Sequence, residues 1–144
     1  MILSMTAWTR TYDAERVFSF VRQFTPLQWI GGMTGIGLEK DGVLVAGVIY
    51  EGFNGHNVWM HVGAVPGKRW MTKDYLLACF RYPFLVAGCR YVRGYVEASN
   101  EVARRFDEHL GFLQEAVLKG AASDGGDVIL YVMHRDECRF LGDK

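Results

Sequence analysis

Three titratable side chains occupy positions from which a sheet could present them for proton transfer: His61, Glu97 and Glu51. His61 falls in the middle of a predicted strand, whereas each glutamate ends a predicted strand. An imidazole exchanges its proton near neutral pH with little tuning, which suits a general base. The alternatives are a hydrogen-bonded core histidine beside Trp59 and, for Glu97, a surface or helix-capping role. The sequence therefore offers candidate bases without a pattern that fixes their use.

Other patterns that carry chemistry are missing from the sequence. His56 and His61 do not have the helical spacing of metal ligands, and neither His109 nor His134 belongs to a recognisable metal-binding motif. No G-x-S-x-G and no Walker-type loop occurs. We therefore predict no metal site, and nothing supports a serine hydrolase or a nucleotide hydrolase.

The composition indicates one domain over residues 1–144, because half of the residues are apolar and can build a substantial core. Lysine plus arginine and aspartate plus glutamate both number 16, so no net charge favours nucleic acid or an anionic membrane. The three cysteines fit a reducing compartment better than a disulfide framework. No signal peptide is recognisable and no apolar run approaches the roughly 18 to 20 residues of a membrane span. These features predict a cytoplasmic protein.

Hydrophobic spacing and turn residues predict the elements that position these side chains. Val17, Phe20, Val21 and Phe24 share one face of a helix over residues 13–24, which a proline at position 26 ends. The Asp41–Gly42 pair predicts a tight hairpin turn between strands over 35–40 and 43–51. Residues 27–34 form either a short helix or an irregular loop.

The remaining elements follow in the same way. In a strand over 58–65, alternate residues from Val58 to Ala64 share an apolar face, with Trp59 and His61 on the other. Thr72 and Asn100 are predicted N-caps of two helices. Pro83 kinks or ends the first, and Gly111 is the left-handed cap of the second. The second helix has an apolar stripe of Val102, Ala103, Phe106 and Leu110. Further strands are predicted over 1–8, 91–97, 114–119 and 127–133.

This order of elements predicts an α/β protein with a mixed central sheet of about seven strands flanked by three to four helices. The segment from Asn100 to Phe112 resembles the penultimate helix of the acyl-CoA-dependent N-acetyltransferases (GNAT superfamily): an asparagine, a small residue three positions on, then Leu-Gly-Phe. The segments 114–119 and 127–133 resemble the closing strands of that family. The ending over 133–141 is similar to small phage-encoded members.

The resemblance implies that acetyl-CoA binds in a V-shaped split between the strands over 58–65 and 91–97. Its pantetheine arm would pair with the first strand like an added strand, and its pyrophosphate would lie at the next helix N-terminus. The implied cofactor-binding residues are Val62, Ala64, Gly67, Lys68, Arg69, Thr72 and Asn100. The loop departs from the family because spaced glycines are replaced after Gly67. Lys68 and Arg69 are alternatively a solvated pair, and Asn100 alternatively only caps its helix.

The implied reaction is transfer of an acetyl group from acetyl-CoA to a primary amine by direct attack. His61 is the first candidate base because it lies at the implied split; Glu97 is the second and Glu51 the third. Many members use a tyrosine to protonate the leaving thiolate, and Asp107 holds the matching position. A carboxyl is a poor acid at neutral pH unless its pKa is raised, so the acid lies elsewhere, or solvent supplies the proton.

The acceptor would be a small molecule or a protein, and no nucleic acid or membrane partner is expected. A catalytically lapsed GNAT-like module that binds a ligand or serves in assembly is the alternative function. A nucleic-acid base modifier on the same fold is a third possibility, and the balanced charge counts against it. A hydrophobic edge strand near either terminus would permit a homodimer.

Overall fold

The structure is a computed structural model, and it describes residues 7–142. The strands are β1 (Trp8–Thr11), β2 (Thr34–Lys40), β3 (Val43–Glu51), β4 (Asn57–Ala64), β5 (Tyr91–Glu97), β6 (Leu113–Leu118) and β7 (Val128–His134). The helices are α1 (Ala14–Val21), α2 (Lys73–Arg81) and α3 (Glu101–Leu110), with a π-helix η1 (Tyr82–Val86) and a 3-10 turn η2 (Arg135–Glu137). Most of the strand predicted over 1–8 lies outside the described residues.

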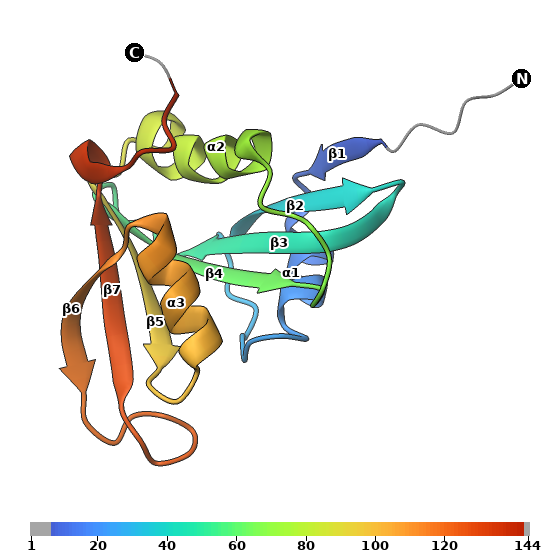
Figure 1. Cartoon of the computed structure of the whole chain (residues 1–144). Helices are drawn as coiled ribbons and strands as arrows, with labels where there is room; N and C mark the ends of the chain where they lie inside the picture. The colour runs from blue at the N-terminus through green and yellow to red at the C-terminus, as the bar shows by residue number, and fades with distance from the viewer. Residues whose placement is uncertain (1–6, 143–144) are drawn as a thin grey trace, which may run out of the picture. The chain divides into compact units, whose positions relative to one another are not determined.

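The strands are ordered β1-β2-β3-β4-β5-β7-β6 in one seven-stranded sheet (Figure 1). The pairs β1–β2, β2–β3, β5–β7 and β6–β7 are antiparallel, whereas β4 and β5 are parallel over three residue pairs at their start. The sheet is therefore mixed, as predicted. Two compact units are recognised: a first unit of Met1–Gly52 and Met60–Cys79, and a second of Phe53–Trp59 and Phe80–Lys144.

The hairpin of β2 and β3 forms where the sequence predicts it. Asp41 and Gly42 have φ angles of 53° and 83°. Positive φ at both central residues is the requirement of the type I′ turn, whose twist matches that of the two strands. The local dipeptide therefore sets the register of β2 and β3 beside the turn, as far as the register shift between Leu38 and Glu39.

Helix α1 packs on the β2–β3 hairpin at strand positions that are occupied by glycine. A Cβ added to Gly47 would lie 2.9 Å from Val21 Cγ2, and one added to Gly35 would lie 3.1 Å from Val17 Cβ. Absence of side chains on the strands thus lets the helix approach closely. Asp13 caps α1 by accepting from the Arg16 amide at 3.2 Å.

Helix α1 ends at Val21, whereas the sequence predicts a helix as far as Phe24. The amides of Gln23 and Phe24 bond to carbonyls three residues back, which tightens the chain into a turn before the proline. Residues 27–34 contain no helix up to the start of β2, so the irregular-loop alternative is right.

Residues on both faces of β4 are buried, whereas the sequence predicts a strand with one apolar face. Val58 and Met60 are buried as predicted, but His61 on the other face is also buried. A Cβ added to Gly63, on the same face as His61, would lie 2.9 Å from Phe24 Cδ2. The His61 side chain therefore lies in the interior of the first unit.

Both predicted helix caps are present. Thr72 Oγ1 accepts from the Tyr75 amide at 3.2 Å, and Asn100 Oδ1 accepts from the Ala103 amide at 3.1 Å. Gly111 has a φ of 109° and ends α3. The π-helix η1 starts as Pro83 enters, since the proline lacks the amide that an α-helix would use. The predicted stripe of α3 is wrong at Val102, which is 79% exposed at the edge of that face.

Strands β5, β7 and β6 form the sheet of the second unit. Val92, Gly94 and Val96 are buried on one face of β5, whereas Tyr91 and Tyr95 are exposed on the other. This alternation is typical of a strand with one covered face. Tyr131, opposite Gly94 on β7, is fully buried on that covered face.

Candidate functional site

A buried histidine and a glutamate come together in the first unit. His61 lies in β4 and is 5% exposed, and its Nε2 atom lies 3.4 Å from Oε1 of Glu51, the last residue of β3. The Glu51 side chain is 22% exposed and is therefore the more accessible member of the pair. The structure thus brings together the first and the third candidate base.

The protonation of His61 follows from its burial. Loss of hydration lowers the pKa of His61 below its ordinary value of 6.5, and the nearby Glu51 carboxylate raises it again by a smaller amount. The net direction is downward, so the imidazole is neutral at pH 7. A neutral imidazole beside a carboxylate can accept a proton, and the carboxylate then stabilises the resulting imidazolium.

Glu97, the second candidate base, has different surroundings. It ends β5 in the second unit, and its carboxylate accepts from the Ser123 hydroxyl at 2.6 and 2.9 Å and from the Ser123 amide at 3.2 Å. Ser123 belongs to the loop between β6 and β7. Glu97 therefore holds this loop against the end of its strand.

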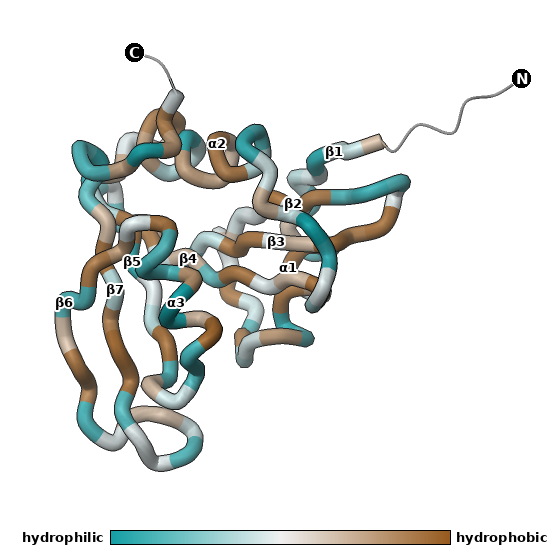
Figure 2. The backbone as a smooth tube through the Cα atoms, viewed as in Figure 1, coloured by the Kyte–Doolittle hydropathy of each residue, from teal (hydrophilic) through white to brown (hydrophobic). Residues whose placement is uncertain are grey.

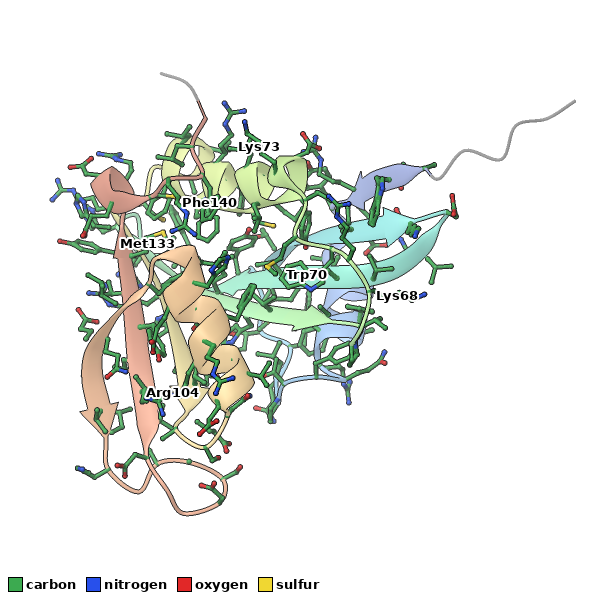
Figure 3. The ribbon with its side chains drawn as sticks, viewed as in Figure 1. Lys68, Trp70, Lys73, Arg104, Met133 and Phe140 are labelled. Carbon is green, nitrogen blue, oxygen red and sulfur yellow. The ribbon has the colours of Figure 1, made fainter. Side chains whose placement is uncertain are left out.

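The loop that follows β4 presents the candidate anion-binding residues. Lys68 and Arg69 are exposed, and Figure 3 shows the Lys68 side chain extending outward from the loop. Gly67 has a φ of 77°, and the Lys68 amide bonds to the Val65 carbonyl. The glycine is thus required by a turn whether or not a phosphate lies beside it.

The same loop leads into the N-terminus of α2. Thr72 caps the helix, and Trp70 lies edge-on to Tyr75 with ring centroids 6.3 Å apart. The first amides of a helix have no carbonyl partner within it, and they attract anions together with the helix dipole. Asp74 in the first turn opposes an anion, but its carboxylate lies 3.4 Å from Arg10 Nη1.

The other predicted cofactor-binding residues lie on two elements. Val62 and Ala64 are half-buried in the second half of β4, within the first unit. Asn100 lies in the second unit, where its side chain is used as the cap of α3.

Asp107 has the raised pKa that a role as a general acid would require. Burial, with a smaller contribution from the neighbouring Glu108 charge, raises the pKa of Asp107 from 3.8 to about 7. A substantial fraction of this carboxyl is therefore protonated at neutral pH. The sequence indicates the position of Asp107 but not the shift of its pKa, because burial on α3 is decided by tertiary packing.

A hollow beside the start of α2 was not anticipated from the sequence. It has a volume of about 500 Å³ in the first unit and is lined by Trp8, Thr9, Arg10, Tyr12, Leu38, Thr72 and Asp74. Four of these lining residues lie in or directly after β1, between Trp8 and Tyr12. Thr72 therefore lines a hollow as well as capping a helix.

Within residues 7–142, no three His, Cys, Asp or Glu side chains lie together so that they could hold a metal ion. The same residues include no helix of the length and apolar character that crossing a membrane requires.

No protein-family model and no curated protein matches the sequence. Solved structures match in fold. The spermidine/spermine N-acetyltransferase SpeG from Vibrio cholerae has a TM-score of 0.72 and 12% identity, over 88% of this chain and 92% of that one. A probable acetyltransferase has a TM-score of 0.63 and 18% identity, over 83% and 69%. A GNAT-family acetyltransferase from Bacillus anthracis has a TM-score of 0.61 and 16% identity, over 72% and 67%.

At these identities the likeness shows the fold alone. The chain has the fold of the GNAT acetyltransferases, which confirms the predicted mixed α/β sheet.

Proposed function

We propose that this protein is an acyl-CoA-dependent N-acetyltransferase that transfers an acetyl group from acetyl-CoA to a primary amine by direct attack. The observation that carries the proposal is the buried His61 with its Nε2 atom 3.4 Å from Glu51 Oε1. A histidine that burial keeps neutral, on a central strand of an acetyltransferase fold, has the protonation state that a base needs.

His61 and Glu51 have complementary roles in this proposal. A lysine-like amine has a pKa of about 10.4 and arrives as an ammonium ion, which the partly exposed Glu51 carboxylate attracts. His61 takes the proton, directly or through a water, and Glu51 stabilises the imidazolium until the proton leaves to solvent. The amine is then neutral and nucleophilic.

The residues present fit acetyl-CoA at the phosphate end. Lys68 and Arg69 are exposed cations, and the α2 N-terminus adds the positive end of the helix dipole and the Thr72 hydroxyl. The backbone of Val62 and Ala64 would bind the pantetheine arm, and Asn100 is a further proposed cofactor-binding residue. Acetyl-CoA supplies the acetyl group as a thioester, so the N–C bond forms as the C–S bond breaks.

Asp107 is the proposed acid for the leaving thiolate. Its carboxyl is held partly protonated by burial, with a pKa of about 7. A group with this pKa can donate a proton to the thiolate near neutral pH and regain one through water, which balances the second proton that the amine nitrogen loses to solvent as the amide forms. Asp107 would then do the work that tyrosine does in many members of the family, whereas Glu97 would serve the loop that it binds.

A second candidate function is a lapsed GNAT-like module that binds a ligand or serves in assembly. The observation that favours it is the glycine-poor loop, in which only Gly67 stands where the family has spaced glycines. Side chains after Gly67 hinder close approach of a phosphate to the backbone. In this reading Lys68 and Arg69 are solvated.

The acceptor is proposed to be a primary amine on a small molecule or a protein. SpeG is named for spermidine and spermine, and one SpeG structure is described as dodecameric, so a small polyamine and self-association are both consistent with the neighbours. A cytoplasmic location is part of the same proposal, and the likeness to phage-encoded members stays a prediction.

Calorimetric titration with acetyl-CoA, followed by thiol release with a panel of amines, tests the proposal. We expect saturable binding and amine-dependent release that His61→Gln reduces strongly. His56→Gln is the matched control, since His56 is an exposed histidine of the second unit. Binding without release for any amine would favour the lapsed module, and no binding would overturn both the enzyme and its phosphate site.

A further inference from the structure

The segment between α1 and β2 exposes apolar side chains and carries no charge. Phe24, Trp29 and Ile30 are 41%, 44% and 56% exposed. Residues 23–33, here called the 23–33 loop, contain no aspartate, glutamate, lysine, arginine or histidine. Figure 2 traces this loop on its way from α1 to β2. A single apolar residue on a surface is ordinary, but several in an uncharged loop indicate a surface that binds an apolar group.

The loop follows α1 onto the face of the sheet that presents His61 and Glu51. Val21 of α1 contacts both strands: a Cβ added to Gly47 would lie 2.9 Å from Val21 Cγ2, and one added to Gly63 would lie 3.2 Å from Val21 Cα. Side chains alternate between the two faces of a strand. Glu51 therefore shares the face of Gly47 on β3. By the same alternation His61 shares the face of Gly63 on β4, so both side chains lie on the α1 side of the first unit.

Two contacts bring the loop to the neighbours of this pair. A Cβ added to Gly63 would lie 2.9 Å from Phe24 Cδ2, so the Phe24 ring covers the strand position two residues after His61. A partly buried leucine of the loop packs against the buried cluster that contains Ile49, two residues before Glu51. Two residues of a strand span about 7 Å. The loop therefore approaches the pair along both β3 and β4.

Trp29 is fixed to the core, and the charge next to the loop is positive. The Trp29 ring lies edge-on to the Phe18 ring with centroids 5.3 Å apart, and Phe18 belongs to the same buried cluster as Ile49. Arg22 directly precedes the loop, with its Cζ atom 5.9 Å from the centroid of the Phe18 ring. The loop thus combines an anchored aromatic ring with a flanking cation.

We propose that the 23–33 loop binds the apolar body of the acceptor, which is therefore a primary monoamine with an alkyl or aryl chain. The proposal rests on the proposed acetyl transfer, in which the Glu51 carboxylate attracts the ammonium end of the acceptor. The chain would then lie along Phe24, Trp29 and Ile30. Removal of its apolar surface from water stabilises it there.

A second ammonium group on the acceptor is disfavoured by the same loop. Residues 23–33 supply no carboxylate to pair with it, and Arg22 repels it. Loss of hydration without a partner adds to the cost. The acceptor would therefore differ from spermidine and spermine, for which the fold neighbour SpeG is named.

Two amines of equal length test this preference. Putrescine, the four-carbon diamine, differs from n-pentylamine only in having an ammonium group in place of the terminal methyl group. Calorimetric titration of each amine into the full chain, with and without CoA, measures binding independently of turnover. We expect n-pentylamine to bind more tightly by about 10-fold or more.

The result separates this inference from the proposed reaction. Equal affinities, tighter binding of putrescine, or no binding of either amine would overturn the inference, even if thiol release shows that the protein is an acetyltransferase. Tighter binding of n-pentylamine without thiol release from acetyl-CoA would support the amine site and overturn the acetyl transfer.

A substitution that changes the preference tests the loop itself. Ile30→Glu places a carboxylate beside the proposed chain, and we expect the affinity ratio to move toward putrescine by about 5-fold. A variant that had lost its fold could not gain affinity for putrescine. Val43→Glu is the matched control, since Val43 is 66% exposed at the opposite end of β3 from Glu51. A ratio that Ile30→Glu leaves unchanged, or that Val43→Glu changes equally, would overturn the assignment to this loop.

Discussion

His61 in the first unit and Asp107 in the second are shifted in opposite directions by one cause. Burial lowers the pKa of His61 and raises the pKa of Asp107 to about 7. In both cases the neutral form is favoured, because loss of hydration penalises charge. For a histidine the neutral form is a base, and for a carboxyl it is an acid. Burial alone can therefore give two ordinary residues complementary acid–base properties.

The neighbours of the two groups differ as much as their shifts. Glu51 beside His61 opposes the shift, so that an imidazolium formed there is stabilised. Glu108 beside Asp107 reinforces the shift, so that a carboxylate formed there is penalised. His61 is therefore suited to hold a proton briefly, and Asp107 is suited to give one up and regain it.

The largest effect is expected at His61. His61→Gln removes the proton acceptor while keeping a side chain of similar polarity, and we expect turnover to fall by about 10²- to 10⁴-fold. Acetyl-CoA affinity should change little. The measurement is the rate of thiol release at saturating amine and acetyl-CoA. Turnover equal to that of His56→Gln would show that His61 is only a core histidine.

A smaller loss is expected at Asp107. Asp107→Asn keeps the shape of the side chain but cannot donate a carboxyl proton, and we expect kcat to fall by about 10- to 100-fold. Asp107→Tyr should recover part of the loss, since a phenol can replace the acid. Unchanged kcat in Asp107→Asn, with acetyl-CoA binding intact, would assign the proton to solvent.

The same substitution should stabilise the fold in a pH-dependent way. The folded Asp107 carboxyl holds its proton more tightly than the unfolded one, so its contribution to stability is greatest at low pH. That contribution is lost as the pH rises from about 3.8 to about 7. Across this window the free energy of unfolding of Asp107→Asn should therefore rise relative to that of the wild type, with a difference of about 1–2 kcal/mol at pH 8. Urea unfolding at pH 4 and pH 8 measures the difference, and an equal gap at both values would contradict the burial of the carboxyl.

The smallest effect is expected in the loop after β4. Removing the charges of Lys68 and Arg69 together should weaken acetyl-CoA binding by about 3- to 10-fold, as expected for exposed ionic contacts, and less so at high salt. Calorimetric titration at two salt concentrations measures this effect. Lys40→Ala, which removes an exposed lysine at the end of β2, is the control. Equal affinities for the double variant and the control would show that Lys68 and Arg69 are a solvated pair that does not contact acetyl-CoA.

The elements that the sequence predicts well are those with local causes. The Asp41–Gly42 turn and the Asn100 and Gly111 caps each depend on a few adjacent residues, and all are present. The end of α1 was misjudged because the tightening turn at Gln23 and Phe24 stops the helix before any proline is reached. The prediction is wrong at Val102 because hydrophobic spacing does not define where the buried face of a helix ends.

The site was predictable only as a set of separate candidates. His61 and Glu51 were each recognised, but their 3.4 Å approach depends on how β3 and β4 are placed side by side, which no local pattern encodes. Glu97 was recognised without its partner, since Ser123 is 26 residues away. The raised pKa of Asp107 depends on burial, and its sequence neighbours contain nothing that reports burial.

The pH dependence of thiol release from acetyl-CoA with an amine acceptor tests the central claim most directly. We predict a bell-shaped profile that rises below pH 6.5 as His61 becomes neutral and falls around pH 7 as Asp107 loses its proton. Asp107→Asn should remove the alkaline fall, and His61→Gln should remove the acid-side rise together with most of the activity. No amine-dependent release at any pH, or a profile that neither substitution alters, would contradict the account.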